Sequence, residues 1–390
     1  MHYKRLLTWI DGSSSYLSVG LDVGADFTWM SIALPNGAFI GKPFKVVHSD
    51  PRSRDLAVTK IKEAQETYSL KSRCFLESTG IYHIPLLCFL RDKGFDCSVI
   101  NPIITKNSTN INIRKLHNDK FDSKKAALVG LNVSLKASII PEDSVVDLRN
   151  LVRDYYYFKD LQSAVALKLT AELKVSFPAY AKVFSKVTTQ SSLKLLSSYP
   201  LAGDMLEASK DDIVETIRST ARFGEAYALR KYDAVIAAAQ DASVFGRALP
   251  SNAVRIRLYI DTYQEYQKHL DALLKALHET VERLQDTLIY DQICLLQSLR
   301  GIGFLSAVVL IAEMGDFKLF PSPKKLYAYF GLDPAVKQSG KLNGDKVHMS
   351  KRGSSLARRV LHMVALNNVK VDKGSGTPVN PVIYDYYTRK

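Results

Sequence analysis

The stretch that decides the fold is residues 16–24, YLSVGLDVG, near the amino terminus. Its apolar residues predict a buried β-strand, which a single carboxylate, Asp22, interrupts. Burying a carboxylate is costly unless a cation or a hydrogen-bond donor replaces the lost water. Asp22 is therefore a candidate functional residue, although a lone Asp in a strand is often a hydrogen-bonded structural residue.

The segments around this strand predict an α/β domain. In chain order they are a hairpin of residues 28–34 and 38–47 around Pro35-Asn36-Gly37, a helix at 51–68, a strand at 73–78, a helix at 83–94 and a strand at 96–102. Three strands that include a hairpin, followed by alternating helix and strand, are the order expected of a ribonuclease-H-like domain.

Three further carboxylates accompany Asp22 in chain order. Glu77 ends a predicted strand in FLESTG, and Asp119 and Asp122 lie three apart in HNDKFD, a spacing that places both on one face of a helix. If the strand ends bring Asp22 and Glu77 opposite that face, four oxygen donors converge, a ligand set suited to Mg²⁺ or Mn²⁺. Two such ions can hold the attacking and leaving oxygens of a phosphodiester.

Two other interpretations of these acids stay open. Two acids in a basic helix usually form a solvated face, so each carboxylate taken singly is weak evidence for a metal site. The motifs GLDVG and ESTG are also similar to phosphate loops of actin-like or sugar kinases. That fold requires a second Asp-x-Gly turn and an adenosine motif downstream, and neither is convincing in this sequence.

The charge balance favours a polyanionic partner. The 390 residues contain 53 Lys and Arg against 39 Asp and Glu, and 14 of these cations against four Asp fall between Phe317 and the carboxyl terminus. Nucleic acid or an anionic membrane surface fits such a charge. The candidate phosphate contacts, each of which can equally be a solvated surface charge, are Arg114, Lys115, Lys351, Arg352, Arg358 and Arg359.

Targeting and cysteine patterns point to a cytoplasmic protein. No stretch approaches the roughly 20 apolar residues of a membrane-spanning helix, and the amino terminus lacks the features of a signal peptide. We therefore expect no membrane partner and a cytoplasmic, nucleoid-associated location. The cysteines form no CxxC pair, and their apolar surroundings predict core packing for all four, Cys74, Cys88, Cys97 and Cys294.

The chain is long enough for several domains. We expect an extension at 1–15, an α/β domain at 16–140, a helical region at 141–290, a mainly helical domain at 291–371 and a less ordered tail at 372–390. From Ile256 to Leu288 an apolar seam with one polar member, Gln267, runs over more than four heptads. The seam predicts either antiparallel packing within the chain or an intermolecular coiled coil. A polar insert at 188–250 is expected to be helical, with no evident chemistry.

The domain at 291–371 holds two candidate phosphate sites. LRGIG resembles the loop of a helix-hairpin-helix element, in which backbone N–H groups at Gly301 and Gly303 hold a DNA phosphate without reading bases. Further along, Ser339 lies in a glycine-bounded loop rich in Lys and Arg. Such cations stabilise a phosphoryl transition state and favour loss of a serine proton, so Ser339 is a candidate nucleophile. Ser-Gly pairs more often mark turns.

Taken together, the motifs LDVG, ESTG, NDKFD, RGIG, SPKKLYAYFGLDP, QSGK and SKRGSS resemble those of the DEDD-type insertion-sequence transposases of the IS110 family, relatives of the Piv pilin-gene invertases. The resemblance runs from about residue 16 to 371. It implies a RuvC-like domain with metal-binding Asp22, Glu77, Asp119 and Asp122, and a carboxy-terminal transposase domain whose catalytic serine is Ser339. The sequence departs from the family pattern at the amino-terminal extension and at Arg300, where the family commonly has proline.

The resemblance also implies partners. Members of this family act as bridge recombinases, pairing double-stranded donor and target DNA through a structured noncoding RNA. We thus expect Mg²⁺ or Mn²⁺, a guide RNA and a homo-oligomer, dimer or tetramer, whose active sites combine the RuvC-like domain of one protomer with the serine domain of another. Two alternatives stay open: a RuvC-like junction nuclease that hydrolyses DNA with an activated water, and a non-catalytic nucleic-acid-binding scaffold.

Overall fold

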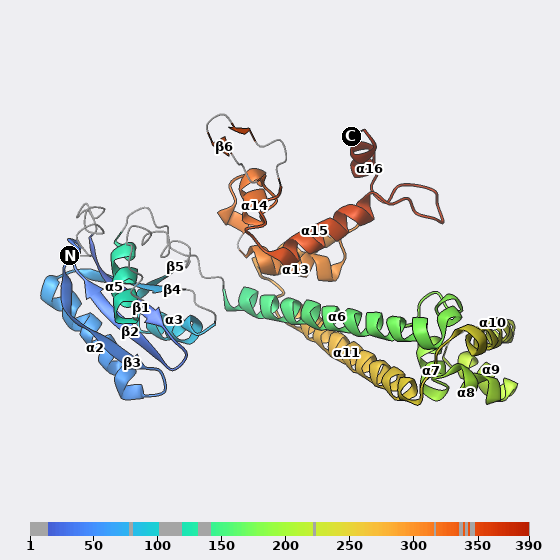
Figure 1. Ribbon diagram of the computed structural model, residues 1–390. Coiled ribbons are helices and arrows are strands. Elements are labelled where there is room, and N and C mark those ends of the chain that lie inside the picture. Colours follow the sequence, from blue (N-terminus) through green and yellow to red (C-terminus); the bar gives the residue numbers. More distant parts are fainter. Residues whose placement is uncertain are drawn as a thin grey trace. The chain divides into compact units, whose positions relative to one another are not determined.

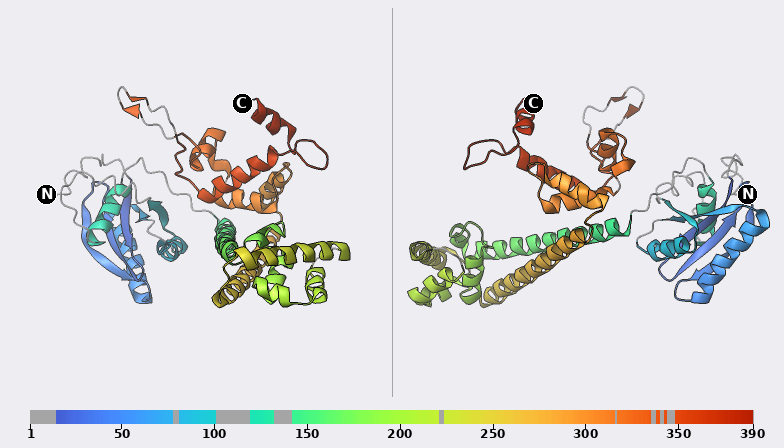
Figure 2. Two further views of the ribbon diagram at one scale, coloured as in Figure 1. Left: turned by 45° about the vertical axis from the view of Figure 1, so that its right-hand side comes forward. Right: turned by 180° about the vertical axis from the view of Figure 1, so that it is seen from behind.

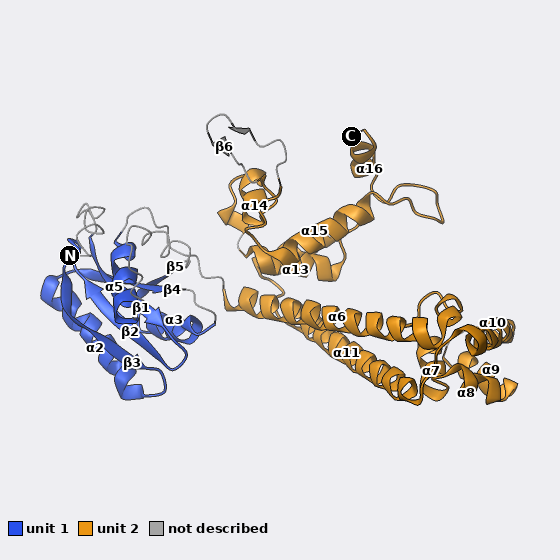
Figure 3. Ribbon diagram, viewed as in Figure 1, with its two compact units in different colours: residues 1–140 blue, residues 141–390 orange. Residues whose placement is uncertain are grey.

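The chain divides into two compact units, residues 1–140 and 141–390 (Figure 3). The computed structural model describes residues 15–77, 81–100, 119–131, 142–220, 224–315, 317–334, 338–339, 342–343 and 348–389. The predicted extension at 1–15 lies almost wholly outside these ranges. Among the helices that are described, none combines the length and the apolar character needed to span a lipid bilayer.

Unit 1 is built on a five-stranded sheet (Figure 1). Its elements are β1 (Tyr16–Val23), β2 (Phe27–Ala33), β3 (Phe39–Val47), α2 (Pro51–Tyr68), β4 (Lys71–Glu77), α3 (His83–Asp92), β5 (Asp96–Ile100) and α5 (Asp119–Gly130). The strand order is β3-β2-β1-β4-β5, with antiparallel pairs among the first three strands and parallel pairs from β1 to β5. The predicted order of strands and helices is confirmed.

The two faces of β1 differ in chemistry. Successive side chains of a strand point to opposite faces. Leu17, Val19, Leu21 and Val23 are buried in one hydrophobic core with residues of α2 and α3. The alternate residues from Ser18 to Asp22 are small or polar and face α5 instead. Helix α5 therefore covers the face of β1 that carries the unusual carboxylate.

Helix α5 packs on β1 at backbone distance. A Cβ atom added to Gly20 would lie 2.2 Å from both the backbone nitrogen of Ala127 and the carbonyl oxygen of Ser123. Real Cβ contacts are never that short, so only glycine lets the helix approach this closely. Three hydroxyl groups then fix the helix along the strand: Ser18 donates to Ala127 O at 2.6 Å, Tyr16 donates to Gly130 O at 2.8 Å, and the hydroxyl oxygens of Ser31 and Ser123 lie 2.8 Å apart.

In unit 2, α6 (Asp143–Ser176) pairs with α11 (Pro250–Glu282) in antiparallel fashion. Leu148 of α6 shares a core with Leu277 of α11, and Leu169 shares another with Ile256. The amide of Gln162 donates to the side-chain oxygen of Gln267 at 2.9 Å, so the one polar seam residue is satisfied within the chain. Of the two interpretations of the seam, antiparallel packing within the chain is observed, and an intermolecular coiled coil stays a prediction.

The seam is shorter than the sequence pattern indicates. Helix α11 ends at Glu282, and Asp286 has a φ of 67°, a left-handed conformation that an α-helix does not contain. Leu288 begins α12 and is 52% exposed. The expectation of one helical seam as far as Leu288 is therefore wrong. The apolar spacing continues across the turn after Glu282, so the heptad pattern does not reveal that the helix ends there.

The predicted polar insert is a small helical bundle. It contains η1 (Pro178–Lys182), α7 (Gln190–Ser198), α8 (Ala202–Glu207), α9 (Lys210–Arg218) and α10 (Glu225–Phe245), gathered where α6 ends and α11 begins (Figure 2). Its core includes Tyr180, Leu195, Met205, Ile213 and Val235. The insert is helical as predicted, but it buries a core that the sequence did not reveal, because α7, α8 and α9 are short and contribute only two or three buried apolar residues each.

The rest of unit 2 packs where α6 begins and α11 ends. It comprises α12 (Leu288–Gln297), α13 (Phe304–Met314), η2 (Phe317–Leu319), α14 (Pro323–Tyr329), β6 (Gln338–Ser339), β7 (Leu342–Asn343), α15 (Ser355–Asn368) and α16 (Pro381–Thr388). Helix α16 corrects the expectation of a less ordered tail. Its start combines Pro381 with a cap in which the Asn380 side chain accepts from the Ile383 backbone N–H.

The cysteines divide into two pairs by burial. Cys74 and Cys97 are buried in the core of unit 1, as expected. Cys88 and Cys294 are exposed, so the expectation of core packing is wrong for these two. Each lies on the exposed side of its helix, next to buried residues such as Leu87 and Ile293, and an apolar run alone does not distinguish the two sides.

Replacing Gly20 with Ala should destabilise unit 1 by about 3 kcal/mol, because the new methyl group overlaps backbone atoms of α5 that cannot move aside. Both tryptophans of the chain, Trp9 and Trp29, belong to unit 1, so tryptophan fluorescence during urea denaturation reports on this unit. Lys62→Ala, an exposed position on α2 of the same unit, is the control and should keep the wild-type midpoint. Equal midpoints for Gly20→Ala and the wild type would contradict the close approach.

Candidate active site

The ends of two parallel strands bring two of the predicted carboxylates together. The register of β1 and β4 pairs Leu21 with Leu76, and continuing it by one residue sets Asp22 beside Glu77. Phe75 lies on the same face of β4 as Glu77, two residues away, and its ring contacts the site that a Cβ on Gly130 of α5 would occupy. Glu77, like Asp22, therefore lies on the α5 face of the sheet.

Helix α5 adds the other two carboxylates. Tyr16 meets the last residue of α5 and Gly20 meets Ser123, so the helix runs opposite to β1. A strand advances about 3.3 Å per residue and a helix about 1.5 Å. The step of two residues from Gly20 to Asp22 therefore corresponds to about four residues of the helix, counted back from Ser123. That position is the first turn of α5, which contains Asp119 and Asp122. The positive end of the helix dipole also favours negative charge there.

The electrostatics of Asp22 reflect this gathering of acids. Burial raises the pKa of Asp22 most, and the charges of Asp122, Asp119 and Glu77 raise it further, from 3.8 to about 7. A carboxylate among three others favours a proton or a cation over its free ionised form. All four predicted carboxylates therefore contribute to one electrostatic site within unit 1.

The residues at this site fit a divalent ion in chemistry. Carboxylate oxygens are the ligands that Mg²⁺ and Mn²⁺ prefer. Within the described ranges, no group of three or more His, Cys, Asp or Glu side chains is arranged so that it could hold a metal ion without moving. Like charges repel, so the carboxylates do not converge on their own. To share an ion, they must turn toward one another.

Ser339 lies in a short hairpin of unit 2. Strands β6 and β7 are antiparallel and pair Gln338 with Asn343 and Ser339 with Leu342. The base of the hairpin is an antiparallel bridge between Pro334 and Met349, next to which the Ser350 backbone N–H donates to Asp333 O at 2.8 Å. The structure describes only the backbone of Ser339, so its predicted role as a nucleophile stays a prediction.

Two glycines bring the two sides of this hairpin base together. A Cβ on Gly353 would lie 1.9 Å from the carbonyl oxygen of Tyr329, and a Cβ on Gly331 would lie 2.5 Å from the backbone nitrogen of Arg352. Gly331 also has a φ of 66°, which residues with a side chain rarely adopt. The segments YFG and KRG around these glycines therefore need both of them to pack backbone against backbone.

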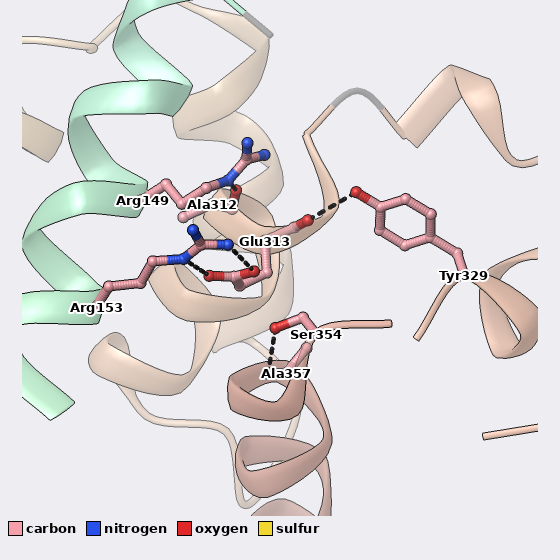
Figure 4. A network of polar contacts seen from close by, with 7 residues as sticks. All are labelled: Arg149, Arg153, Ala312, Glu313, Tyr329, Ser354 and Ala357. Atoms are coloured by element: carbon pink, nitrogen blue, oxygen red, sulfur yellow. Dashed lines mark hydrogen bonds and ion pairs between the residues drawn. The ribbon is translucent and has the colours of Figure 1, made fainter. Parts of the chain in front are cut away.

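A buried acid fastens this region to α6 (Figure 4). Glu313 of α13 is 3% exposed, and Arg153 of α6 donates to its two carboxylate oxygens at 2.8 and 3.0 Å. Burial alone raises the pKa of Glu313, but the hydrogen bonds and charge of Arg153 outweigh it and hold the pKa below its ordinary value. The hydroxyl of Tyr329 donates to the backbone oxygen of Glu313 at 3.1 Å, which links α14 to the same point.

Sequence reasoning missed Glu313, although a signal was present. An acid in the apolar run FLSAVVLIAEM interrupts a helix just as Asp22 interrupts a strand. Its partner Arg153 lies 160 residues away, and a single sequence does not reveal that pairing.

The predicted phosphate contacts differ in their surroundings. The guanidinium group of Arg358 donates to the backbone oxygens of Phe330 and Gly353 at 2.9 and 2.7 Å, and Arg359 forms an ion pair with Asp160 at 2.8 Å. These two arginines thus also hold the fold together. Lys351 and Arg352 are exposed beside the hairpin base. Arg114 and Lys115 lie outside the described residues.

The helix-hairpin-helix prediction concerns the turn between α12 and α13. Gly301 has a φ of 83°, and a Cβ there would lie 2.4 Å from the side-chain nitrogen of Asn368. Gly303 is the N-cap of α13, and a Cβ there would meet nothing within 4 Å. Gly301 is therefore required by the turn itself, and the open space at Gly303 is compatible with an approaching phosphate.

Comparison with known families accounts for both regions. A model of DEDD transposases of the IS110 type matches residues 19–178, and a model described as the transposase IS116/IS110/IS902 family matches residues 294–380. The chain belongs to the IS110 family of transposases. In this IS110-family chain, all four carboxylates fall in the first matched region and Ser339 falls in the second.

Two curated proteins resemble parts of this IS110-family chain. The candidate transposase y4qE of Sinorhizobium fredii is 30% identical over 121 residues, 30% of this chain. An uncharacterised 43.6 kDa protein of insertion element IS110 from Streptomyces coelicolor is 32% identical over 83 residues, 21% of this chain. The matched stretches span 31% and 20% of those proteins, so the likeness to each is local.

Raising the pH from 5 to 8 in EDTA should lower the melting temperature of unit 1. The pKa of Asp22 is about 7 in the fold against an ordinary value of 3.8, so the folded state holds an extra proton between these values and loses this advantage as the pH rises through 7. In Asp22→Asn this contribution to the pH dependence should disappear, with a higher melting temperature at pH 8. The measurement is a thermal scan of tryptophan fluorescence.

Mg²⁺ at pH 8 should raise the melting temperature of the wild type and raise that of Asp22→Asn much less, because binding to the fold stabilises it. Asp55→Asn, an exposed acid of α2, is the control and should respond as the wild type does. An equal response to Mg²⁺ in Asp22→Asn and the wild type would remove Asp22 from the proposed ligands.

Glu313→Gln should destabilise unit 2 by about 2 kcal/mol at pH 7, less than the full cost of breaking a buried ion pair because Arg153 is half exposed. The folded pKa of Glu313 is lowered, so its contribution is present above the ordinary value of 4.5 and is lost as the pH falls below it. Urea unfolding followed by circular dichroism should therefore show a difference that shrinks at acidic pH. The exposed Glu207→Gln is the control, and a difference independent of pH would contradict this role.

Proposed function

We propose that this chain is a DNA recombinase of a mobile genetic element, which cuts DNA strands and rejoins them to new partners. The observation that carries the proposal is the site in unit 1, where the pKa of Asp22 is raised to about 7 by burial and by three other carboxylates. Membership of the IS110 transposase family and the net charge of +14 support DNA as the substrate.

The carboxylates have a binding role in this proposal. Asp22, Glu77, Asp119 and Asp122 would hold Mg²⁺ or Mn²⁺, which when bound stabilises negative charge on the oxygens of the reacting phosphate. Asp22 gives up its proton when the ion binds, because the cation replaces the proton as compensation for the neighbouring acids. Binding should therefore weaken as the pH falls below about 7.

Ser339 has the role of nucleophile. Its hydroxyl oxygen forms a bond to phosphorus, the bond from phosphorus to the leaving strand breaks, and the serine proton passes to solvent while the leaving oxygen gains one. A hydroxyl of the incoming strand then attacks the same phosphorus and releases the serine. The phosphodiester energy is kept in the covalent link, so rejoining needs no ATP. The exposed Lys351 and Arg352 are suited to the phosphate charge.

The remaining parts of the proposal concern partners. The resemblance to bridge recombinases supports a structured noncoding RNA that pairs with donor and target DNA, and a homo-oligomer, dimer or tetramer, as the active form. A strongly basic chain can bind two kinds of nucleic acid at once, because both carry one charge per phosphate. Base pairing with the RNA would then select the target sequence.

A metal-dependent junction nuclease is the second candidate. One observation favours it: the four carboxylates belong to unit 1 alone, so a water activated by the bound ions needs no residue of unit 2. The two candidates differ in the product, because hydrolysis leaves nicked DNA without attached protein.

Ser339→Ala should abolish the covalent protein–DNA adduct and leave nucleic-acid binding largely intact. The assay combines the purified chain, Mg²⁺, labelled DNA from the flanks of the gene and RNA transcribed from the adjacent noncoding DNA, and resolves the adduct on a denaturing gel. Ser298→Ala, an exposed serine of the same unit, is the control and should form adduct as the wild type does. Nicked DNA without adduct in the wild type would favour the nuclease, and loss of adduct only when the RNA is withheld would support RNA guidance.

A further inference from the structure

Unit 1 contains a cavity that the proposed chemistry does not use. Its volume is about 300 Å³. It is lined by Ala25 and His48, which follow strands β1 and β3, and by Ile81 and Tyr82, which directly precede α3. The cavity thus lies beyond the carboxyl end of β1, on the α2 and α3 side of the sheet, whereas Asp22 and Glu77 at that end face α5.

The walls of the cavity are apolar and aromatic. Phe89 and Leu86 line it from α3, and Leu86 belongs to the core that also contains Leu21 and Val23 of β1. Tyr82 and Ile81 form an outer rim and are 50% and 72% exposed. Large apolar side chains this exposed, beside a cavity, are typical of a surface that a ligand covers.

One cation in the wall has unused hydrogen-bonding capacity. Arg54 of α2 donates from one terminal nitrogen to the backbone oxygen of His48 at 2.8 Å, and its guanidinium carbon lies 5.8 Å from the centre of the Phe89 ring. Its Nε is buried and finds no acceptor among the described residues. The side chain as a whole is only half-buried and carries further N–H donors besides the one used by His48, so a ligand with acceptor atoms is suited to this wall.

His48 forms a fixed part of the same wall. Its Nδ1 lies 3.1 Å from the backbone oxygen of Ala25, which only accepts, so this nitrogen is the donor. Its Nε2 lies 2.7 Å from the hydroxyl oxygen of Thr28, so both ring nitrogens have a partner. The ring is therefore held in one orientation, and among the described residues that line the cavity none carries a negative charge.

We propose that this cavity accepts one unstacked nucleobase of the DNA strand whose phosphate lies at the carboxylates. A base has two apolar faces for Tyr82 and Phe89 and acceptor atoms at its edge for Arg54, and aromatic and guanidinium groups are those on which proteins stack single bases. The volume suits one small planar ligand, at the lower end of ligand pockets. The inference rests on the proposed function for its substrate and adds a contact beside the cut phosphate.

The first test compares two single strands of 12 nucleotides, one of deoxythymidine and one with every base absent, by fluorescence anisotropy with the full chain in EDTA. The wild type should bind the thymidine strand about tenfold more tightly, because each base stacked on an aromatic ring contributes to affinity. Tyr82→Ala should remove most of this preference by removing a wall. Ala25→Trp should do the same by filling the cavity. Tyr68→Ala, an exposed tyrosine of α2 outside the cavity, and Ala25→Ser are the controls and should keep the preference.

The outcomes separate this inference from the proposed function. Equal binding of both strands by the wild type, or a preference unchanged in Tyr82→Ala and Ala25→Trp, overturns the base site and leaves nucleic-acid binding intact. Binding of neither strand overturns the base site as well, while the proposed function is tested separately by the adduct assay with Ser339→Ala. A lower melting temperature of Ala25→Trp with an unchanged preference would mean that the chain itself fills the cavity, which also overturns the proposal.

A second measurement locates the base directly. A strand that carries 5-iododeoxyuridine is irradiated with the full chain, and the crosslinked tryptic peptides are identified by mass spectrometry. The proposal predicts a crosslink in the peptide of residues 74–91, which contains Tyr82 and Phe89, and its loss in Ala25→Trp. Crosslinks confined to other peptides would contradict it.

Discussion

The close approach of helix α5 to strand β1 at Gly20 is the constraint on which the candidate active site depends. With backbone against backbone, the helix cannot slide or rotate on the strand without a steric clash, and the hydroxyls of Tyr16, Ser18 and Ser31 fix its position along the strand. The first turn of α5 is then held over the carboxyl end of β1. Asp22 and the two acids of α5, almost a hundred residues apart in the chain, come close because Gly20 has no side chain.

The sequence predicted unit 1 well because its signals are local. The alternation in β1, the turn at Pro35-Asn36-Gly37 and the apolar runs of β4 and β5 each act within a few residues, and the parallel order places Asp22 and Glu77 at one edge. The insert at 188–250 was less predictable, because helices of six to nine residues such as α7, α8 and α9 repeat too little to show which side is buried. The pairing of Arg153 with Glu313 joins residues 160 apart and leaves no local trace.

The two halves of the chemistry are supported differently in the fold. The carboxylates are placed by a small-residue contact that excludes water and leaves Asp22 electrostatically unsatisfied. The base of the Ser339 hairpin is held by polar groups that have partners: both oxygens of Glu313 accept from Arg153, and Arg358 donates to two backbone oxygens. Gly331 and Gly353 let the two segments of the base pack backbone against backbone. The unsatisfied carboxylate of Asp22 favours binding of a ligand. The base of the hairpin, which these paired groups hold, instead forms a rigid support for a short loop.

The paired helices α6 and α11 have a mechanical consequence. At about 1.5 Å per residue, a helix of the length of α6 extends about 50 Å. Its two ends belong to different cores, one with the small bundle and one with the hairpin-bearing domain. Gln162 and Gln267 match midway, and a shift by one turn would break their hydrogen bond and leave the buried amide of Gln162 without this partner. The pair therefore acts as a spacer of defined length, and anything grasped by the small bundle is kept at a set distance from the serine hairpin.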